Sequence, residues 1–141
     1  QCAGPVLGIG QAAMQAATLL SLRYSILTPM ERSVTILAQN ARRYGLDASL
    51  RGVHALNLPV LALEESYPLI EARAREVLAA DRSECLVLGC AGFTLFRQPL
   101  EQALGIPVID GVQVGLQWLA GLTRLGLNTS KRCSYAYPEI K

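Results

Sequence analysis

The side chains of this 141-residue chain that could act as bases, nucleophiles or metal ligands include four cysteines, at positions 2, 85, 90 and 133, and one histidine, His54. No two cysteines form a CxxC pair, and His54 lies far from all of them in the sequence, so the spacing does not favour a zinc site. Unpaired thiols in a chain with a large apolar share are typical of reduced, cytoplasmic proteins. We therefore expect a cytoplasmic protein with reduced thiols and no metal.

Cys90 is the thiol whose position best suits chemistry. It follows the continuous apolar run 85–88, which predicts a buried strand, and it precedes the small residues Ala91 and Gly92. A thiol at the start of the next helix lies in the positive end of the helix dipole, which favours the thiolate. The alternative is a small buried residue, as most unpaired cysteines are, and position alone leaves both interpretations open. Cys85 is expected in the core and Cys133 in an exposed tail.

Other candidate residues follow the remaining predicted strands. Ligands of open α/β sheets bind beyond the carboxyl ends of the strands, where we expect Gly8-Ile9-Gly10, Thr28 and Asp110. The segment Thr28-Pro29-Met30-Glu31 fits a capping box, and Asp110 is expected to cap the last helix. Capping explains both residues without a ligand, so a ligand contact from Thr28 stays an alternative.

The Gly8-Ile9-Gly10 turn also resembles the start of a dinucleotide fingerprint. The third glycine is missing, because position 13 is alanine, and no acidic residue follows about twenty positions later to bind a ribose. We therefore expect no nucleotide cofactor.

Short apolar runs alternate with segments of helical period, which is the pattern of β-α units around a parallel sheet. We expect strands at 5–9, 24–27, 85–88 and 107–109, and one or two more within 50–63, where 60–63 is the better candidate. We expect helices at 11–20, 31–44, 70–80, 100–104 and 111–125, followed by an extended polar tail from Asn128. The predicted fold class is α/β, a parallel sheet flanked by helices.

The composition and net charge limit the classes of molecule that we expect the protein to bind. The hydrophobic share is 51%, yet no run approaches the roughly twenty apolar residues of a membrane span, and residues 1–4 lack the pattern of a secretory signal. A net charge of +2 does not favour nucleic acid or an anionic membrane. We expect a small-molecule substrate as partner, with neither nucleic acid nor membrane. The apolar composition also favours a homo-oligomer.

Five segments resemble, in order, those of the hydantoin and allantoin racemases, a branch of the aspartate/glutamate racemase superfamily. They are Pro5–Met14, Leu27–Val34, Val87–Phe93, Pro107–Val112 and Thr129–Arg132. The resemblance implies two facing α/β domains that each supply one cysteine, so that one thiolate removes a proton beside a carbonyl and the opposite thiol returns one. It implies no metal or organic cofactor. It assigns Cys90 as an acid/base, Gly89, Ala91 and Gly92 as residues that shape the substrate pocket, and Thr28 as a hydroxyl contact.

The chain also departs from the family pattern. The first cysteine of the family lies in an N-terminal domain, and Cys2 does not match its position. The resemblance therefore implies that residues 1–110 form the second domain and that 111–141 form a closing helix and tail that return to a first domain. We expect little activity from this segment alone. Phe93 stands where many relatives have Met, and Pro99 interrupts what is usually a continuous helix.

Two alternatives stay open. One is another cysteine-based reaction of the superfamily: amino-acid racemisation, arylmalonate decarboxylation or maleate isomerisation. The other is a non-catalytic domain that binds a small ligand. The residues around Cys90 favour the hydantoin branch.

Overall fold

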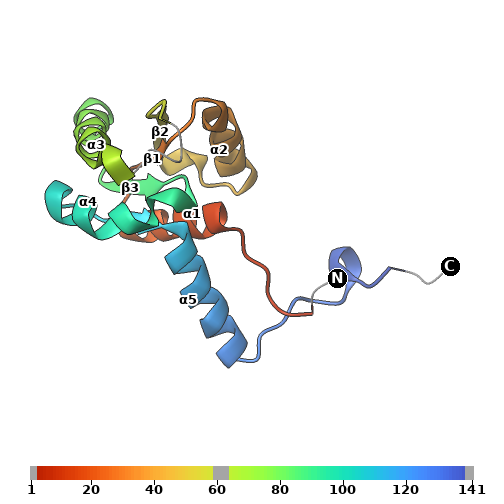
Figure 1. Ribbon diagram of the computed structural model, residues 1–141. Coiled ribbons are helices and arrows are strands. Elements are labelled where there is room, and N and C mark those ends of the chain that lie inside the picture. Colours follow the sequence, from red (N-terminus) through yellow and green to blue (C-terminus); the bar gives the residue numbers. More distant parts are fainter. Residues whose placement is uncertain (1–2, 59–63, 139–141) are drawn as a thin grey trace.

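The computed structural model describes residues 3–58 and 64–138. Within them, parallel strands form one sheet in the order β2-β1-β3-β4 (Figure 1). The strands are β1 (Tyr24–Thr28), β2 (Leu50–Ala55), β3 (Cys85–Leu88) and β4 (Val108–Asp110). The α-helices are α1 (Ile9–Leu20), α2 (Arg32–Arg43), α3 (Tyr67–Asp81), α4 (Arg97–Leu104) and α5 (Gly111–Arg124), and a 3-10 turn, η4 (Ala91–Phe96), joins β3 to α4.

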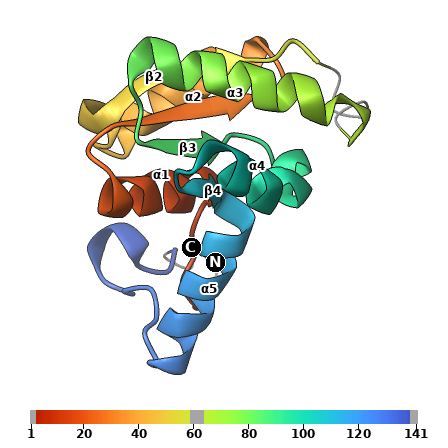
Figure 2. The ribbon, with the colours of Figure 1, turned by 90° about the vertical axis from the view of Figure 1, so that its left-hand side faces the viewer.

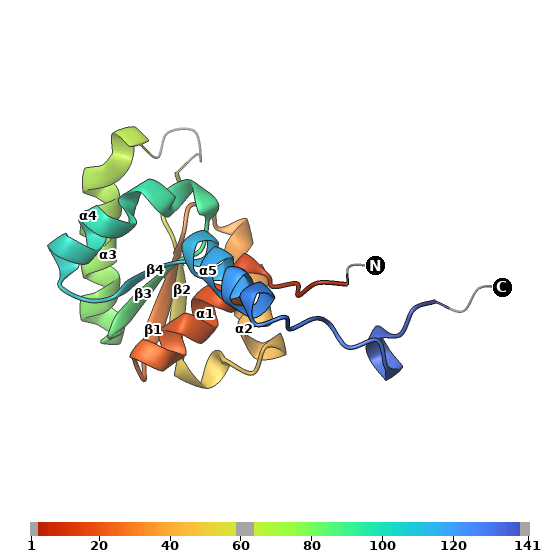
Figure 3. The same cartoon turned by 90° about the horizontal axis from the view of Figure 1, so that it is seen from below.

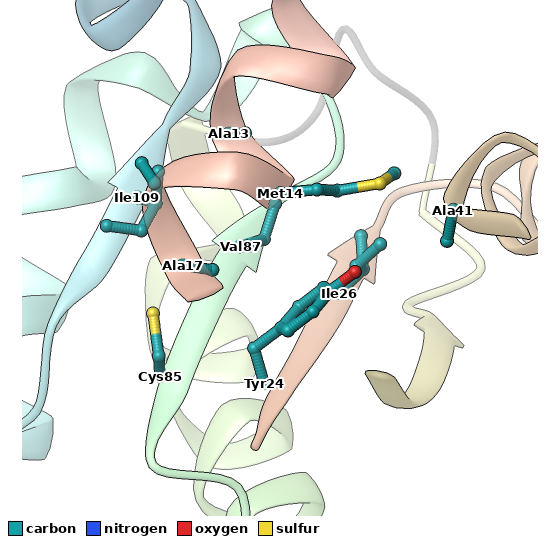
Figure 4. Packing of buried hydrophobic residues seen from close by; sticks show 10 residues of the cluster. Ala13, Met14, Ala17, Tyr24, Ile26, Ala41, Cys85, Val87 and Ile109 are labelled. Atoms are coloured by element: carbon teal, nitrogen blue, oxygen red, sulfur yellow. The ribbon is translucent and has the colours of Figure 1, made fainter. Parts of the chain in front are cut away.

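Helices cover both faces of the sheet, because alternate strand residues point to opposite sides. On one face, α1 and α2 pack over residues of β1, β3 and β4 (Figure 4): Tyr24, Ile26, Cys85, Val87 and Ile109. On the other face, Leu27, Leu86, Leu88 and Val108 pack with residues of α3, η4 and α4. Figure 3 shows the sheet between these two helical layers. The structure thus confirms the predicted α/β class.

The first predicted strand is wrong. Residues 5–8 have no strand pairing, and α1 begins at Ile9, with Gly8 as its N-cap in an extended conformation. Val6 is 75% exposed, so the apolar run does not enter the core as a strand would. Of the strands expected within 50–63, β2 begins at Leu50, and the preferred candidate at 60–63 lies outside the described residues.

The other predicted elements agree with the structure to within a few residues at their ends. Pro99 does not interrupt a helix, because α4 begins at Arg97 and places the proline in its first turn, where amide groups have no intrahelical partner. The tail is not wholly extended, since a further 3-10 turn covers Cys133–Tyr135. Among the described residues, no helix is both long and apolar enough to cross a membrane.

Helix α5 crosses α1 and then projects beyond the two helical layers (Figure 2). Its buried residues are the glycines Gly111 and Gly115, and a Cβ at Gly115 would lie 3.6 Å from the Cβ of Ala12. Small residues therefore let the two helices approach closely at the amino end of α5. Beyond α5, the tail returns beside the first residues of the chain, where the Thr129 amide donates to the Ala3 carbonyl at 3.1 Å.

Candidate functional site

Cys90 lies directly after β3, at the carboxyl edge of the sheet. It is the N-cap of η4, and its Sγ accepts a hydrogen bond from the Gly92 amide at 3.4 Å. The residue is partly exposed, so the thiol is accessible as well as hydrogen-bonded. The strand-terminal position predicted for Cys90 is therefore the position it occupies.

A pocket of about 340 Å³ opens beside this thiol. Three helical N-termini converge on it, because α1, η4 and α5 all begin at the same edge of the sheet, as the α/β topology dictates. The lining residues from these starts and from the strand ends are Gly8, Ile9, Gly10, Leu88, Gly89, Cys90, Ala91, Asp110, Gly111 and Val112. The first amides of a helix have no intrahelical carbonyl partner, so helix starts direct N–H groups to the pocket, and such groups suit a carbonyl or developing oxyanion.

Two glycines allow the elements of this wall to pack closely, because neither position has room for a side chain. A Cβ at Gly89 would lie 2.9 Å from Ile26 Cγ2 and 3.0 Å from Leu37 Cδ1. A Cβ at Gly111 would overlap the carbonyl oxygen of Ile9. The starts of α1 and α5 are thus brought together by close packing at Gly111, and the end of β3 packs closely against β1 and α2 at Gly89.

Asp110 provides the charged side chain of the pocket lining. It caps α5, since its Oδ1 accepts the Val112 amide at 3.0 Å, which confirms the predicted cap. The residue is only 2% exposed, and its Oδ2 has no hydrogen-bond partner among the described residues. Most buried polar atoms are paired, and the cap bond to Val112 does not account for this second oxygen.

Thr28 does not line the pocket that holds Cys90. It is 1% exposed, and its carbonyl accepts the Leu56 amide at 2.9 Å. The predicted capping box is also wrong, because α2 begins only at Arg32 and its N-cap, Glu31, makes no side-chain cap bond. The Met30 carbonyl, which accepts the Ser33 amide, closes the turn into the helix instead.

The structure brings the other predicted pocket residues together. Gly89 and Ala91 line the pocket, and Gly92 supplies the amide that reaches the thiol. Phe93, the next residue, is fully buried and packs in the core below α4 rather than in the pocket.

The remaining described thiols are unsuited to the same role. Cys85 is completely buried, and burial raises the pKa of its thiol to about 12. Cys133 is exposed in the tail. Cys2 lies outside the described residues. In residues 3–58 and 64–138, no group of three His, Cys, Asp or Glu side chains could hold a metal ion.

A separate polar cluster surrounds Asp81 at the end of α3. Its carboxylate accepts hydrogen bonds from the Ser25 and Ser83 hydroxyls, and His54 Nε2 lies 3.1 Å from Oδ2. Burial alone would raise the Asp81 pKa, but these hydrogen bonds outweigh it and hold the pKa below the ordinary value. His54 contacts the carboxylate and, among the described residues, makes no hydrogen bond to a serine, so the cluster joins β1, β2 and α3 rather than activating a hydroxyl.

Sequence reasoning missed the wall that α2 contributes to the pocket. Leu37, Asn40 and Tyr44 line it, opposite Met14 of α1. Their spacing of three and four residues is the signal that could have revealed a shared helix face. Asn40 and Tyr44 carry the polar groups on a face that otherwise reads as apolar packing.

Comparison with known proteins gives consistent results over the whole chain. A profile of the family described as Asp/Glu/Hydantoin racemase matches residues 1–119. The hydantoin racemase of Rhizobium meliloti is 43% identical over 142 residues, which cover 98% of this chain and 59% of the relative. The chain therefore spans less than two thirds of the length of this curated relative.

Solved structures show the same architecture. The allantoin racemase from Klebsiella pneumoniae superposes with a TM-score of 0.93 at 39% identity, over 99% of this chain and 59% of that one. The glutamate racemase from Francisella tularensis superposes with a TM-score of 0.59 at 18% identity, over 90% of this chain and 51% of that one. The second likeness concerns the fold alone.

Proposed function

Because the chain belongs to the Asp/Glu/hydantoin racemase family, we propose that it forms the Cys90-bearing half of a racemase for hydantoin- or allantoin-like cyclic ureides. The observation that carries the proposal is the place of Cys90. This thiol is partly exposed, accepts the Gly92 amide, and lies in a pocket where three helices begin.

The chemistry of a cyclic ureide suits this arrangement. The hydrogen on its C5 atom is acidic because the carbon lies beside a carbonyl, and its removal places negative charge on the carbonyl oxygen. Backbone amides fixed in the pocket wall stabilise such charge without reorganising. In the proposed reaction, the Cys90 thiolate takes the C5 proton from one face, or its thiol returns a proton there, while a thiol on the opposite face does the reverse.

We further propose that residues 1–110 form one α/β domain of the enzyme and that 111–141 form a closing helix and tail directed to another domain. Helix α5 supports this division, because Gly115 and Trp118 pack on the core beside α1 whereas the carboxyl end of the helix projects from the layers (Figure 2). Exposed apolar side chains of α5 and its C-cap, Leu116 at 65% and Leu125 at 74%, are suited to burial against a partner.

Two finer proposals follow, one from the cysteine content and one from the exposed surface of α5. Unpaired thiols favour the cytoplasm as the place of action. The exposed apolar face of α5 favours assembly, either with the other domain or with a second copy of the protein.

The test is the optical rotation of single enantiomers incubated with the intact protein. We expect loss of rotation with a 5-substituted hydantoin and none with glutamate. We expect Cys90→Ser to abolish the loss and Cys133→Ser, which changes an exposed tail thiol, to retain it. Racemisation of glutamate in preference to the hydantoin would assign the protein to a different branch of the superfamily.

A further inference from the structure

The α2 wall of the pocket, formed by Leu37, Asn40 and Tyr44, has no part in the proton transfer at Cys90. The three side chains share one face of α2 because they are three and four residues apart. Tyr44 keeps this register, since it is the C-cap of α2 with right-handed helical dihedrals. The α2 wall is therefore a continuous surface along one side of the pocket.

The α2 wall runs from the neighbourhood of the thiol to the start of α1. At one end, Leu37 Cδ1 lies 3.0 Å from the place of a Cβ on Gly89, the residue before Cys90. At the other end, the Tyr44 hydroxyl lies 3.9 Å from the place of a Cβ on Gly8, the N-cap of α1. A ligand group that extends from the neighbourhood of Cys90 along α2 thus reaches Tyr44.

The end of the wall near the thiol is apolar. Met14 extends from α1 toward α2, beside Ile26 of the sheet (Figure 4). Both residues line the pocket together with Leu37. The part of a ligand group nearest Cys90 therefore contacts apolar side chains. The polar groups of the α2 wall lie farther from the thiol.

Those polar groups are the amide of Asn40 and the hydroxyl of Tyr44. Within the described residues, neither side chain makes a hydrogen bond, although their backbones are joined in the helix. Asn40 is partly buried and Tyr44 is 37% exposed. An amide and a phenol without partners on a pocket wall suit a ligand group that both donates and accepts hydrogen bonds.

We propose that the α2 wall binds the substituent on the reacting ring carbon, and that Asn40 and Tyr44 favour a ureido substituent over an apolar one of equal size. The inference rests on the proposed function, because it needs the ring carbon to lie at Cys90. A ureido group, –NH–CO–NH₂, pairs its carbonyl and N–H groups with the donor and acceptor of an Asn amide, and with a phenol. An isobutyl group has the same number and connectivity of non-hydrogen atoms and would leave those protein groups unpaired.

The test uses protection of the Cys90 thiol, a readout that needs occupancy of the pocket and not turnover. 5-Ureidohydantoin and 5-isobutylhydantoin are titrated against alkylation by iodoacetamide, and the Cys90 peptide is followed by mass spectrometry. In the intact protein, we expect the ureido compound to protect at the lower concentration. Asn40→Leu and Tyr44→Phe should each reduce this preference, by about tenfold or less for the loss of one hydrogen bond.

The matched control is Gln39→Leu, which makes the same amide-to-alkyl change on the exposed face of α2, outside the pocket lining. It should keep the preference of the unsubstituted protein. If both compounds protect Cys90 but Asn40→Leu and Tyr44→Phe leave their ratio unchanged, the role of the α2 wall is refuted while ureide binding stands. If neither compound protects Cys90 in the unsubstituted protein, the proposed function fails first and the inference with it.

Discussion

The backbone amide of Gly92 donates a hydrogen bond to Sγ of Cys90 at 3.4 Å, across the first turn of η4. An N–H that points at sulfur can donate to the negative charge that sulfur carries when it acts as a base or is alkylated. The donor is a backbone group, so proline is the residue that would remove it at position 92.

Replacing Gly92 by proline therefore tests the amide directly. We expect Gly92→Pro to slow the alkylation of Cys90 several-fold at neutral pH, and Gly92→Ala, which keeps the N–H, to have a much smaller effect. The rates are read from the labelled Cys90 peptide, with melting temperatures recorded to show that both variants fold. Cys85 serves as an internal reference that stays unlabelled, because burial raises its thiol pKa to about 12. Equal alkylation rates in Gly92→Pro and Gly92→Ala would show that the Gly92 amide does not promote the reaction of Cys90.

The crossing of α1 and α5 predicts a stability difference between two glycines of one helix. A Cβ at Gly111 overlaps the Ile9 carbonyl oxygen, whereas a Cβ at Gly121 has nothing within 4 Å. We expect Gly111→Ala to destabilise the protein by about 1–3 kcal/mol through overpacking. Gly121→Ala should be neutral or stabilising by up to about 1 kcal/mol, because alanine has the higher helix propensity. Denaturant unfolding measures both, and a Gly111→Ala variant as stable as Gly121→Ala would contradict the close approach.

Asp110 should contribute to stability through its cap on α5. Asp110→Ala removes the acceptor of the Val112 amide and should cost about 1 kcal/mol of unfolding free energy. Asp110→Asn retains an oxygen acceptor at the N-cap and should cost less. Unfolding curves of the two variants distinguish the contribution of the cap hydrogen bond to stability from that of the negative charge. If Asp110→Asn destabilised as much as Asp110→Ala, the charge of the carboxylate rather than its cap bond would be the stabilising feature.

The Asp81 cluster predicts a pH dependence of stability. Hydrogen bonds from Ser25, Ser83 and His54 outweigh burial and hold the Asp81 pKa below its ordinary value of 3.8. The folded protein therefore binds the proton more weakly than the unfolded chain, so the stabilisation is present above pH 3.8 and is lost as the pH falls through the lower folded pKa. We expect Asp81→Asn to lower the melting temperature near neutral pH and to flatten its fall in acid. A melting temperature with the same acid slope in both proteins would exclude Asp81 as its source.

The sequence predicted the sheet and the place of Cys90 because both follow from local patterns. The continuous apolar run of β3 predicts a strand buried on both faces, and the end of that strand places the thiol at the carboxyl edge. The same reasoning failed at 5–9, where apolar residues precede a helix and find no strand to pair with. Asp110 was predicted as a cap, but its unpaired oxygen became evident only with burial.

The α2 wall could not be predicted from the sequence, for a physical reason. Asn40 and Tyr44 lie about fifty residues before Cys90 in the sequence, and they reach its pocket only because α1 and α2 pack on the same face of the sheet. Thr28 shows the converse. It lies at the end of a strand as expected, yet the late start of α2 leaves it buried outside the pocket.

The exchange of the C5 hydrogen of a 5-substituted hydantoin for deuterium, followed by NMR in D₂O, tests the role of Cys90 most directly. One thiol suffices for exchange on its own face of the ring. We expect the protein, and the Cys133→Ser control, to exchange the hydrogen of both enantiomers faster than buffer alone, and Cys90→Ser to fall to the buffer rate with the one enantiomer whose C5 hydrogen faces Cys90. Exchange of both enantiomers by Cys90→Ser at the rate of the unsubstituted protein would contradict the account.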